Sequence, residues 1–141
     1  MSEFKGTPGP WVADIRGGCA AIYPERLASD TNGCHRGDSR NIAYSDKGAH
    51  FNGRHWEIDP AVAHDFMVMA ATPELLKALQ WALPLAIIAI EAHRMERVKC
   101  GHMDINGTYM NGETWVGIYQ DEVDRIESCR LAIAKALREP Q

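Results

Sequence analysis

The stretch TPELLKALQWALPLAIIAI, residues 72–90, decides the fold of this chain. Its opening, Thr72-Pro73-Glu74, is typical of a helix start. Threonine caps the first turn, proline fits there, and the acidic charge suits the positive end of the helix dipole. From Trp81 to Ile90 the stretch is apolar on almost every side of a helix. Because a helix that is apolar all round is usually buried, we expect a long central helix in the core.

Two further helices are expected on either side of this one. Asp59 and Pro60 predict a helix start, and that helix runs to about Ala71. The last helix is expected over residues 113–137, where apolar residues recur at intervals of three and four. Residues 100–112 are rich in glycine and asparagine, so a loop or small hairpin is expected before the last helix.

The first part of the chain, residues 1–59, has short runs that are typical of β-strands. These runs alternate apolar and polar side chains or lie beside a glycine turn such as Gly17-Gly18. The expected strands are residues 11–15, 19–23, 41–44 and 54–58. We therefore predict an α+β fold in a single domain, residues 1–141. In it, a small antiparallel β-meander of three to four short strands packs on two or three long α-helices, most of them from residues 60–141.

Length and charge exclude several classes of protein. The chain has 141 residues and a formal net charge of −4, which fits one domain without the surplus of basic residues that non-specific nucleic-acid binding needs. The apolar run from Trp81 to Ile90 is far shorter than the roughly 20 residues of a membrane span, so no membrane contact is expected. The N-terminal MSEFKGTPGPW lacks the pattern of a signal peptide, so a cytoplasmic location is expected.

The cysteines fit this location. Cys19, Cys34, Cys100 and Cys129 show no C-x-x-C spacing, and the reducing cytosol is expected to keep them as thiols. A bridge between Cys19 and Cys34 stays open as an alternative, because both lie in a turn-rich region.

Three motifs together carry a resemblance to a known family. They are TPGPW at residues 7–11, MAATPELLKAL at residues 69–79 and RLAIAKAL at residues 130–137. In this order they resemble a family of small phage and prophage proteins with an N-terminal TPGPW and a central AAxPELLxAL. The chain departs from the family at residues 67–69, where Leu-Ile-Ala is commoner, and in its long segment 25–59. The resemblance implies an origin in a phage or prophage, inside an infected or lysogenic bacterium, rather than a reaction.

The polar loop of residues 25–40 holds the sharpest cluster of candidate binding residues. Arginine side chains and the amides of glycine-rich turns bind phosphate, and an aromatic ring stacks on a base. The candidates for a nucleotide or other phosphate ligand are Arg26, His35, Arg36, Arg40, Tyr44 and Trp56. The alternative is a solvated loop whose arginines pair with Asp30 and Asp38.

Histidines and catalytic motifs give little support for an enzyme. His50, His55 and His64 have the chemistry of transition-metal ligands, but their spacing matches no known metal motif. The chain has no G-x-S-x-G motif, P-loop or G-x-G-x-x-G motif. A metal-dependent enzyme is therefore the least favoured function, and neither a catalytic residue nor a cofactor is expected.

Acidic residues of the last helix indicate a protein partner. Asp121, Glu122 and Asp124 lie near its start, and residues 60–141 contain 11 acidic against 8 basic residues. We expect an exposed acidic face that meets a basic partner. The expected function is that of a non-enzymatic phage accessory protein that binds a host or phage macromolecule, for instance to modulate host defence; a nucleotide-sequestering protein is the alternative. A homo-oligomer through the long helices is also expected, because their apolar surface exceeds what a small sheet covers.

Overall fold

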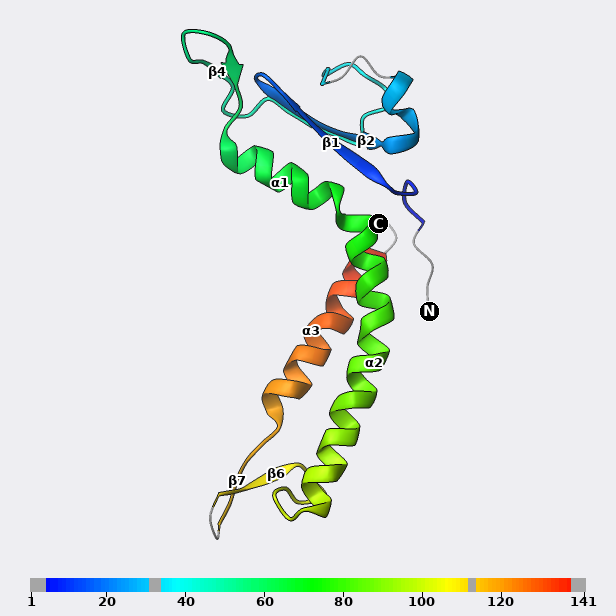
Figure 1. Ribbon diagram of the computed structural model, residues 1–141, viewed down its shortest axis with the longest axis vertical. Helices are drawn as coiled ribbons and strands as arrows, with labels where there is room; N and C mark the ends of the chain where they lie inside the picture. The colour runs from blue at the N-terminus through cyan, green and yellow to red at the C-terminus, as the bar shows by residue number, and fades with distance from the viewer. Residues whose placement is uncertain (1–4, 31–33, 112–113, 138–141) are drawn as a thin grey trace. The chain divides into compact units, whose positions relative to one another are not determined.

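Two compact units make up the chain, one comprising Lys5–Leu75 and the other beginning at Leu76. The computed structural model describes residues 5–30, 34–111 and 114–137 (Figure 1). The first unit contains the expected strands together with the first helix, although the sequence pattern groups that helix with the later ones. The structure is of the predicted α+β class.

The first unit is built on a three-stranded antiparallel sheet with β2 in its centre. Strand β1 (Trp11–Arg16) pairs with β2 (Cys19–Pro24) across the Gly17-Gly18 turn, in which Gly17 has a φ of 50°. The short strand β3 (Ala43–Ser45) pairs with the other edge of β2, and the 3-10 helix η1 (Glu25–Asp30) follows β2 directly. The predicted hairpin and third strand are therefore confirmed.

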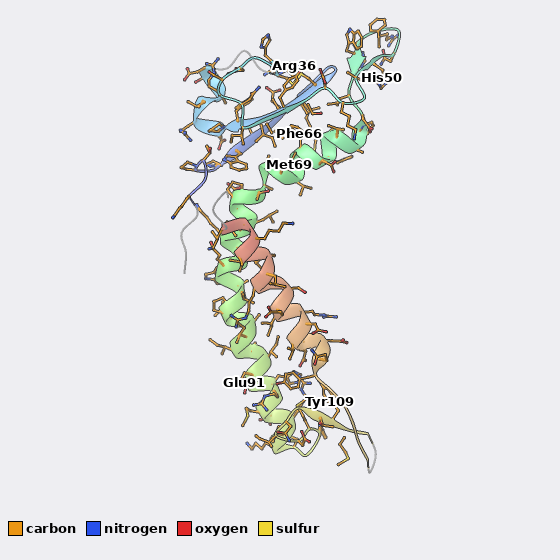
Figure 2. All side chains as sticks on the ribbon, turned by 180° about the vertical axis from the view of Figure 1, so that it is seen from behind. Arg36, His50, Phe66, Met69, Glu91 and Tyr109 are labelled. Carbon is orange, nitrogen blue, oxygen red and sulfur yellow. A yellow bond between two sulfur atoms is a disulfide. The ribbon has the colours of Figure 1, made fainter. Side chains whose placement is uncertain are left out.

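Helix α1 (Pro60–Ala70) covers one face of this sheet. The Asp59 carboxylate accepts a hydrogen bond of 2.9 Å from the amide of Ala61, and Pro60 occupies the first turn, so the predicted helix start is confirmed. Figure 2 shows Phe66 on α1 beside the sheet. The core cluster is Ala20, Ile22, Ile58 and Phe66, with Trp11, Ile15, Ala43, Val62 and Ala63 packed around it.

The other face of the sheet holds a buried carboxylate. Asp14 is only 8% exposed, and it accepts hydrogen bonds from the Tyr23 hydroxyl at 2.7 Å and from the Arg16 guanidinium at 2.8 Å. Burial of the Tyr23 phenol, followed by its hydrogen bond to Asp14, raises the pKa of Tyr23 above its ordinary value of 10.0. The two donors satisfy a group that would otherwise be costly to bury.

A disulfide joins Cys19, at the start of β2, to Cys34 in the loop that follows η1. The Cα atoms are 6.2 Å apart, within the usual range for a disulfide. The expectation of free thiols is therefore wrong for this pair, because the turn-rich segment folds back onto the sheet. Cys100 and Cys129 are free.

The second unit is a pair of helices connected through a hairpin (Figure 1). Helix α2 (Thr72–Lys99) leads to strands β6 (Thr108–Asn111) and β7 (Thr114–Ile118), and α3 (Gln120–Leu137) follows. Arg97 of α2 joins these parts: its guanidinium donates to Glu122 of α3 at 2.8 Å and to the Tyr109 hydroxyl of β6 at 2.5 Å.

The last helix begins later than the sequence predicts. Residues 114–118 form β7, which pairs with β6, and Gly117 has a φ of 67° that a helix does not allow. Thr114, Trp115 and Val116 are β-branched or aromatic, and such residues favour a strand. Glu113, where the helix was expected to begin, lies outside the described residues.

The prediction that the stretch from Trp81 to Ile90 is buried is wrong. Trp81 is 72% exposed and Ile88 is 65% exposed, whereas Leu83 on the other side of α2 is buried. The reason is that the described residues of the second unit offer α2 a neighbouring helix on one side only. By length and composition alone, α2 is long and apolar enough to cross a membrane. The uninterrupted apolar run from Trp81 to Ile90, taken by itself, is too short to indicate this.

Replacement of Tyr23 tests the importance of the buried carboxylate. We expect Tyr23→Phe to lower the free energy of unfolding by about 1–3 kcal/mol, because Asp14 then loses a buried donor. Because the pKa of Tyr23 is raised on folding, the stabilisation holds below pH 10 and declines as the pH rises through that raised value.

Urea unfolding at several pH values measures both effects. Tyr44→Phe is the matched control, because the described residues give the Tyr44 hydroxyl no hydrogen bond. Equal stability of the two variants at neutral pH would contradict the role of Tyr23.

Candidate functional site

A small hairpin projects from the segment between β3 and α1 (Figure 1). Its strands β4 (His50–Phe51) and β5 (Trp56–Glu57) pair His50 with Glu57 and Phe51 with Trp56. The Asn52 side chain accepts hydrogen bonds from the amides of Arg54 and His55 at 2.8 and 3.0 Å, and these bonds hold the turn. The strand expected at residues 54–58 is therefore present, but it is shorter than expected.

One face of this hairpin carries two exposed aromatic rings. The rings of Phe51 and Trp56 lie 5.9 Å apart with their planes at 53°, a tilted arrangement that aromatic pairs favour. Each residue is 56% exposed. The two rings form one exposed apolar surface, and aromatic residues are enriched among those that dominate binding energy at interfaces.

The hairpin is anchored at the turn end of the sheet. A Cβ atom placed on Gly18, in the β1–β2 turn, would lie 3.4 Å from the Cβ of Trp56 and 3.1 Å from that of Ala49. The absence of a side chain at Gly18 therefore allows Trp56 to approach the turn closely. This contact fixes the root of the hairpin while the outer part of the aromatic pair stays in water.

The other face of the hairpin is polar. His50 and His55 approach the Glu57 carboxylate at 3.4 and 3.2 Å, and the Asn52 amide donates to it at 2.7 Å. The hydrogen bond from Asn52, followed by the charges of His55 and His50, lowers the pKa of Glu57 below its ordinary 4.5. Glu57 is therefore an ionised acceptor that ties the two strands and the turn together.

The three candidate metal ligands do not come together. His50 and His55 lie on the hairpin (Figure 2 labels His50), whereas His64 lies on α1 and is exposed. Among the residues that the structure describes, no group of three or more histidine, cysteine or carboxylate side chains is arranged to hold a metal ion. The hairpin histidines pair with Glu57 instead.

Two of the three arginines of the polar loop, Arg36 and Arg40, are paired with carboxylates. Arg36 forms an ion pair with Asp46 and lies 5.8 Å above the Tyr44 ring. Arg40 binds Asp38 through two hydrogen bonds of 2.8 and 3.2 Å. The pairing of these arginines with nearby carboxylates fits the alternative of a solvated loop, except that Arg36 pairs with Asp46 and not with Asp30 or Asp38. Each of these two arginines therefore already has an anionic partner within the loop region.

The remaining ligand candidates lie at two ends of the sheet. His35 follows Cys34, which the disulfide holds beside the start of β2, and Trp56 lies against the turn at that same end. Arg26 lies on η1, beyond Pro24 and thus past the other end of β2. From Cys19 to Pro24 the extended strand rises by five residue steps, so its two ends are about 17 Å apart. One small ligand therefore does not contact all six candidates.

The acidic candidates of α3 also separate. Glu122 is partly buried and faces Arg97, whereas Asp121 and Asp124 are exposed. The hydrogen bond with Glu122 is the largest cause of a raised pKa at Arg97. Glu122 therefore helps to hold α3 against α2, and the outward acidic face is reduced to Asp121 and Asp124.

The sequence prediction includes Trp56 among the site residues but misses Phe51. The signal was the Asn52-Gly53 turn with an aromatic residue on each side, which places both rings on one face of a short hairpin.

Comparison with known proteins identifies a phage protein family. The sequence model of the family described as Salmonella phage P22 protein Y8K6 matches residues 1–140 of the chain. No curated protein and no solved structure matches this chain. The match agrees with the phage origin that the sequence motifs imply.

Replacement of Asn52 tests the electrostatics of the hairpin. We expect Asn52→Asp to raise the pKa of Glu57, because the amide donor is lost and a negative charge takes its place. The new carboxylate keeps an oxygen acceptor for the turn amides. The pKa of Glu57 is lowered in the folded hairpin. The ionic contacts of Glu57 therefore stabilise the hairpin fully when the pH is above the ordinary pKa of 4.5, and this stabilisation is lost as the pH falls through the lowered pKa.

The pKa is read from the side-chain carboxyl carbon of Glu57 by NMR titration. Asn106→Asp, in a turn of the second unit, is the control and leaves Glu57 unchanged. An unaltered titration in Asn52→Asp would show that the amide does not stabilise the carboxylate.

Proposed function

Because the chain belongs to the Salmonella phage P22 protein Y8K6 family, we propose that it is a phage accessory protein that binds a host or phage protein through the β4–β5 hairpin. The observation that carries the proposal is the exposed pair of rings, Phe51 and Trp56. Within this proposal, the protein acts in the bacterial cytoplasm, and its binding modulates host defence.

The energetics of the aromatic pair support a protein partner. The exposed area is on the order of 100 Å² for each ring, and covering both is worth about 5 kcal/mol before the costs of association. Aromatic side chains are also enriched among the few residues that dominate binding energy. Two neighbouring rings therefore suffice as the centre of a protein interface.

The hairpin separates its apolar and polar side chains. His50, Asn52, His55 and Glu57 lie on the face opposite to the rings, so the rings form an apolar face without charged groups, and depletion of charge is typical of the centre of a protein interface. The turn hydrogen bonds and the contact with Gly18 order the hairpin before binding. An ordered surface loses less entropy on association.

Binding by variants tests the proposal. A photo-crosslinking phenylalanine analogue at position 51, which keeps Trp56 in place in the full chain, identifies the partner in infected cells by mass spectrometry. With that partner purified, we expect Trp56→Ala to weaken binding about thirtyfold or more and Phe51→Ala to act in the same direction.

The matched control is Val68→Ala, which removes another exposed apolar side chain of the same unit (64% exposed) and leaves binding unchanged. Equal affinities for Trp56→Ala and the unmodified chain would refute the role of the hairpin. Circular dichroism of each variant excludes a loss of fold as the cause.

The alternative function, sequestration of a nucleotide or another phosphate ligand, makes a different prediction. A ligand at about 100 times its dissociation constant adds roughly 2.7 kcal/mol to stability, which raises the melting temperature by several degrees. We expect no such rise with nucleotides, inorganic phosphate or Zn²⁺, because Arg36 and Arg40 already have carboxylate partners and the described residues form no group of three potential metal ligands.

A thermal-shift series with the full chain measures this. A rise with a nucleotide that Arg36→Ala abolishes would replace the proposal with the alternative. A rise with Zn²⁺ that is lost in His50→Ala would instead favour a metal-dependent function.

A further inference from the structure

Helix α2 carries a second apolar stripe on its outward face. Trp81, Leu85, Ile88 and Met95 are 72%, 49%, 65% and 46% exposed. With the exposed Ala78 and Ala92, they follow one another at alternating intervals of three and four residues. This is the spacing of the seam along which two helices pack in a coiled coil.

The opposite face of α2 already has its partner. Leu83 is buried, and a shallow groove between the two helices is lined by Ile87 and Ile90 of α2 and by Val123 and Ile126 of α3. At 100° per residue, the mean directions of the two stripes are on nearly opposite sides of the helix. Helix α3 therefore leaves the outward stripe uncovered.

Charges beside the outward stripe distinguish the possible arrangements of a second copy. Between Ala78 and Ile90 the helix has no charged residue, and Lys77 and Glu91 lie at the two ends of this segment along the same edge of the stripe. Glu91 also binds Arg94 and borders the groove toward α3, but its side chain is 56% exposed and has acceptor capacity for another cation. Figure 2 labels Glu91 on α2.

An antiparallel arrangement matches these charges, and a parallel one does not. When two copies of α2 run in opposite directions, residues of the same edge face each other, so Lys77 meets the partner's Glu91 at both ends. When they run in the same direction, Glu91 lies opposite the partner's Glu96, and like charges repel. The pattern is thus complementary to itself in one orientation.

We propose that α2 pairs antiparallel with α2 of a second copy of this chain, with Lys77 opposite the partner's Glu91 and the two-fold axis near Pro84. In this register, Trp81 packs on the partner's Leu85, and Ile88 packs on the partner's Ala78. Large side chains thus meet smaller ones, as close packing requires. The pairing uses a different surface from the hairpin and does not rest on the proposed function.

A charge exchange tests both the dimer and its orientation. Sedimentation equilibrium of the full chain should show a dimer that dissociates on dilution. Lys77→Glu should weaken it about tenfold, because two attractive contacts become repulsive. The double variant Lys77→Glu with Glu91→Lys should restore it. Failure of the double variant to recover affinity, with its helix content retained, would overturn the antiparallel register.

Replacement of the seam supplies a matched pair of variants. Ile88→Glu should abolish the dimer, because a charge is placed in the middle of the stripe. Leu131→Glu, at an exposed leucine of α3 (61% exposed), should leave it intact. Dissociation by both variants would show that the interface lies elsewhere.

A zero-length carbodiimide cross-link fixes the pairing directly. Lys77 and Glu91 are fourteen residues apart on one helix, about 21 Å, so a cross-link between them must join two chains. We expect it in the dimer band and not in Ile88→Glu. A chain that stays monomeric at all concentrations, or that floats with phosphatidylcholine vesicles through this stripe, would overturn the proposal in favour of a monomer or a membrane surface.

Discussion

The packing of Phe66 against Ala20 and Ile22 is the contact on which the first unit depends. A small sheet has one apolar face to remove from water, and α1 is the element that covers it. Once α1 is docked there and β3 has joined β2, both ends of the segment between them are fixed. The aromatic hairpin lies within that segment, so its position follows from the core and from the contact of Trp56 with the Gly17-Gly18 turn.

Local signals in the sequence were sufficient for the elements of this unit. The Gly17-Gly18 turn and the Asp59-Pro60 cap each act within a few residues, and the structure forms both as expected. The burial of α2 was not predictable in the same way, because an apolar helix is covered only where another element provides a surface. The strand at Thr114–Ile118 escaped prediction since its apolar residues fit a helical period as well as a β-pairing.

The candidate site shows the same limit. Residue type alone identifies arginines as phosphate ligands, but the carboxylates that occupy Arg36 and Arg40 become evident only in three dimensions. Likewise, the turn-rich spacing allows the Cys19–Cys34 bridge without requiring it. Trp56 was recognised as an aromatic near the loop, whereas its pairing with Phe51 depends on the register of two very short strands.

The outward stripe of α2 has a consequence for the strength of binding. In the proposed dimer each copy contributes one hairpin, so a target that displays the same epitope twice offers a site to both hairpins. After the first contact, the second forms at an effective concentration set by the tether, in the millimolar range for short flexible connections. Avidity of this kind raises apparent affinity by about a hundredfold or more. A hairpin that binds weakly alone would then suit a repetitive target, such as an oligomer, better than a single molecule.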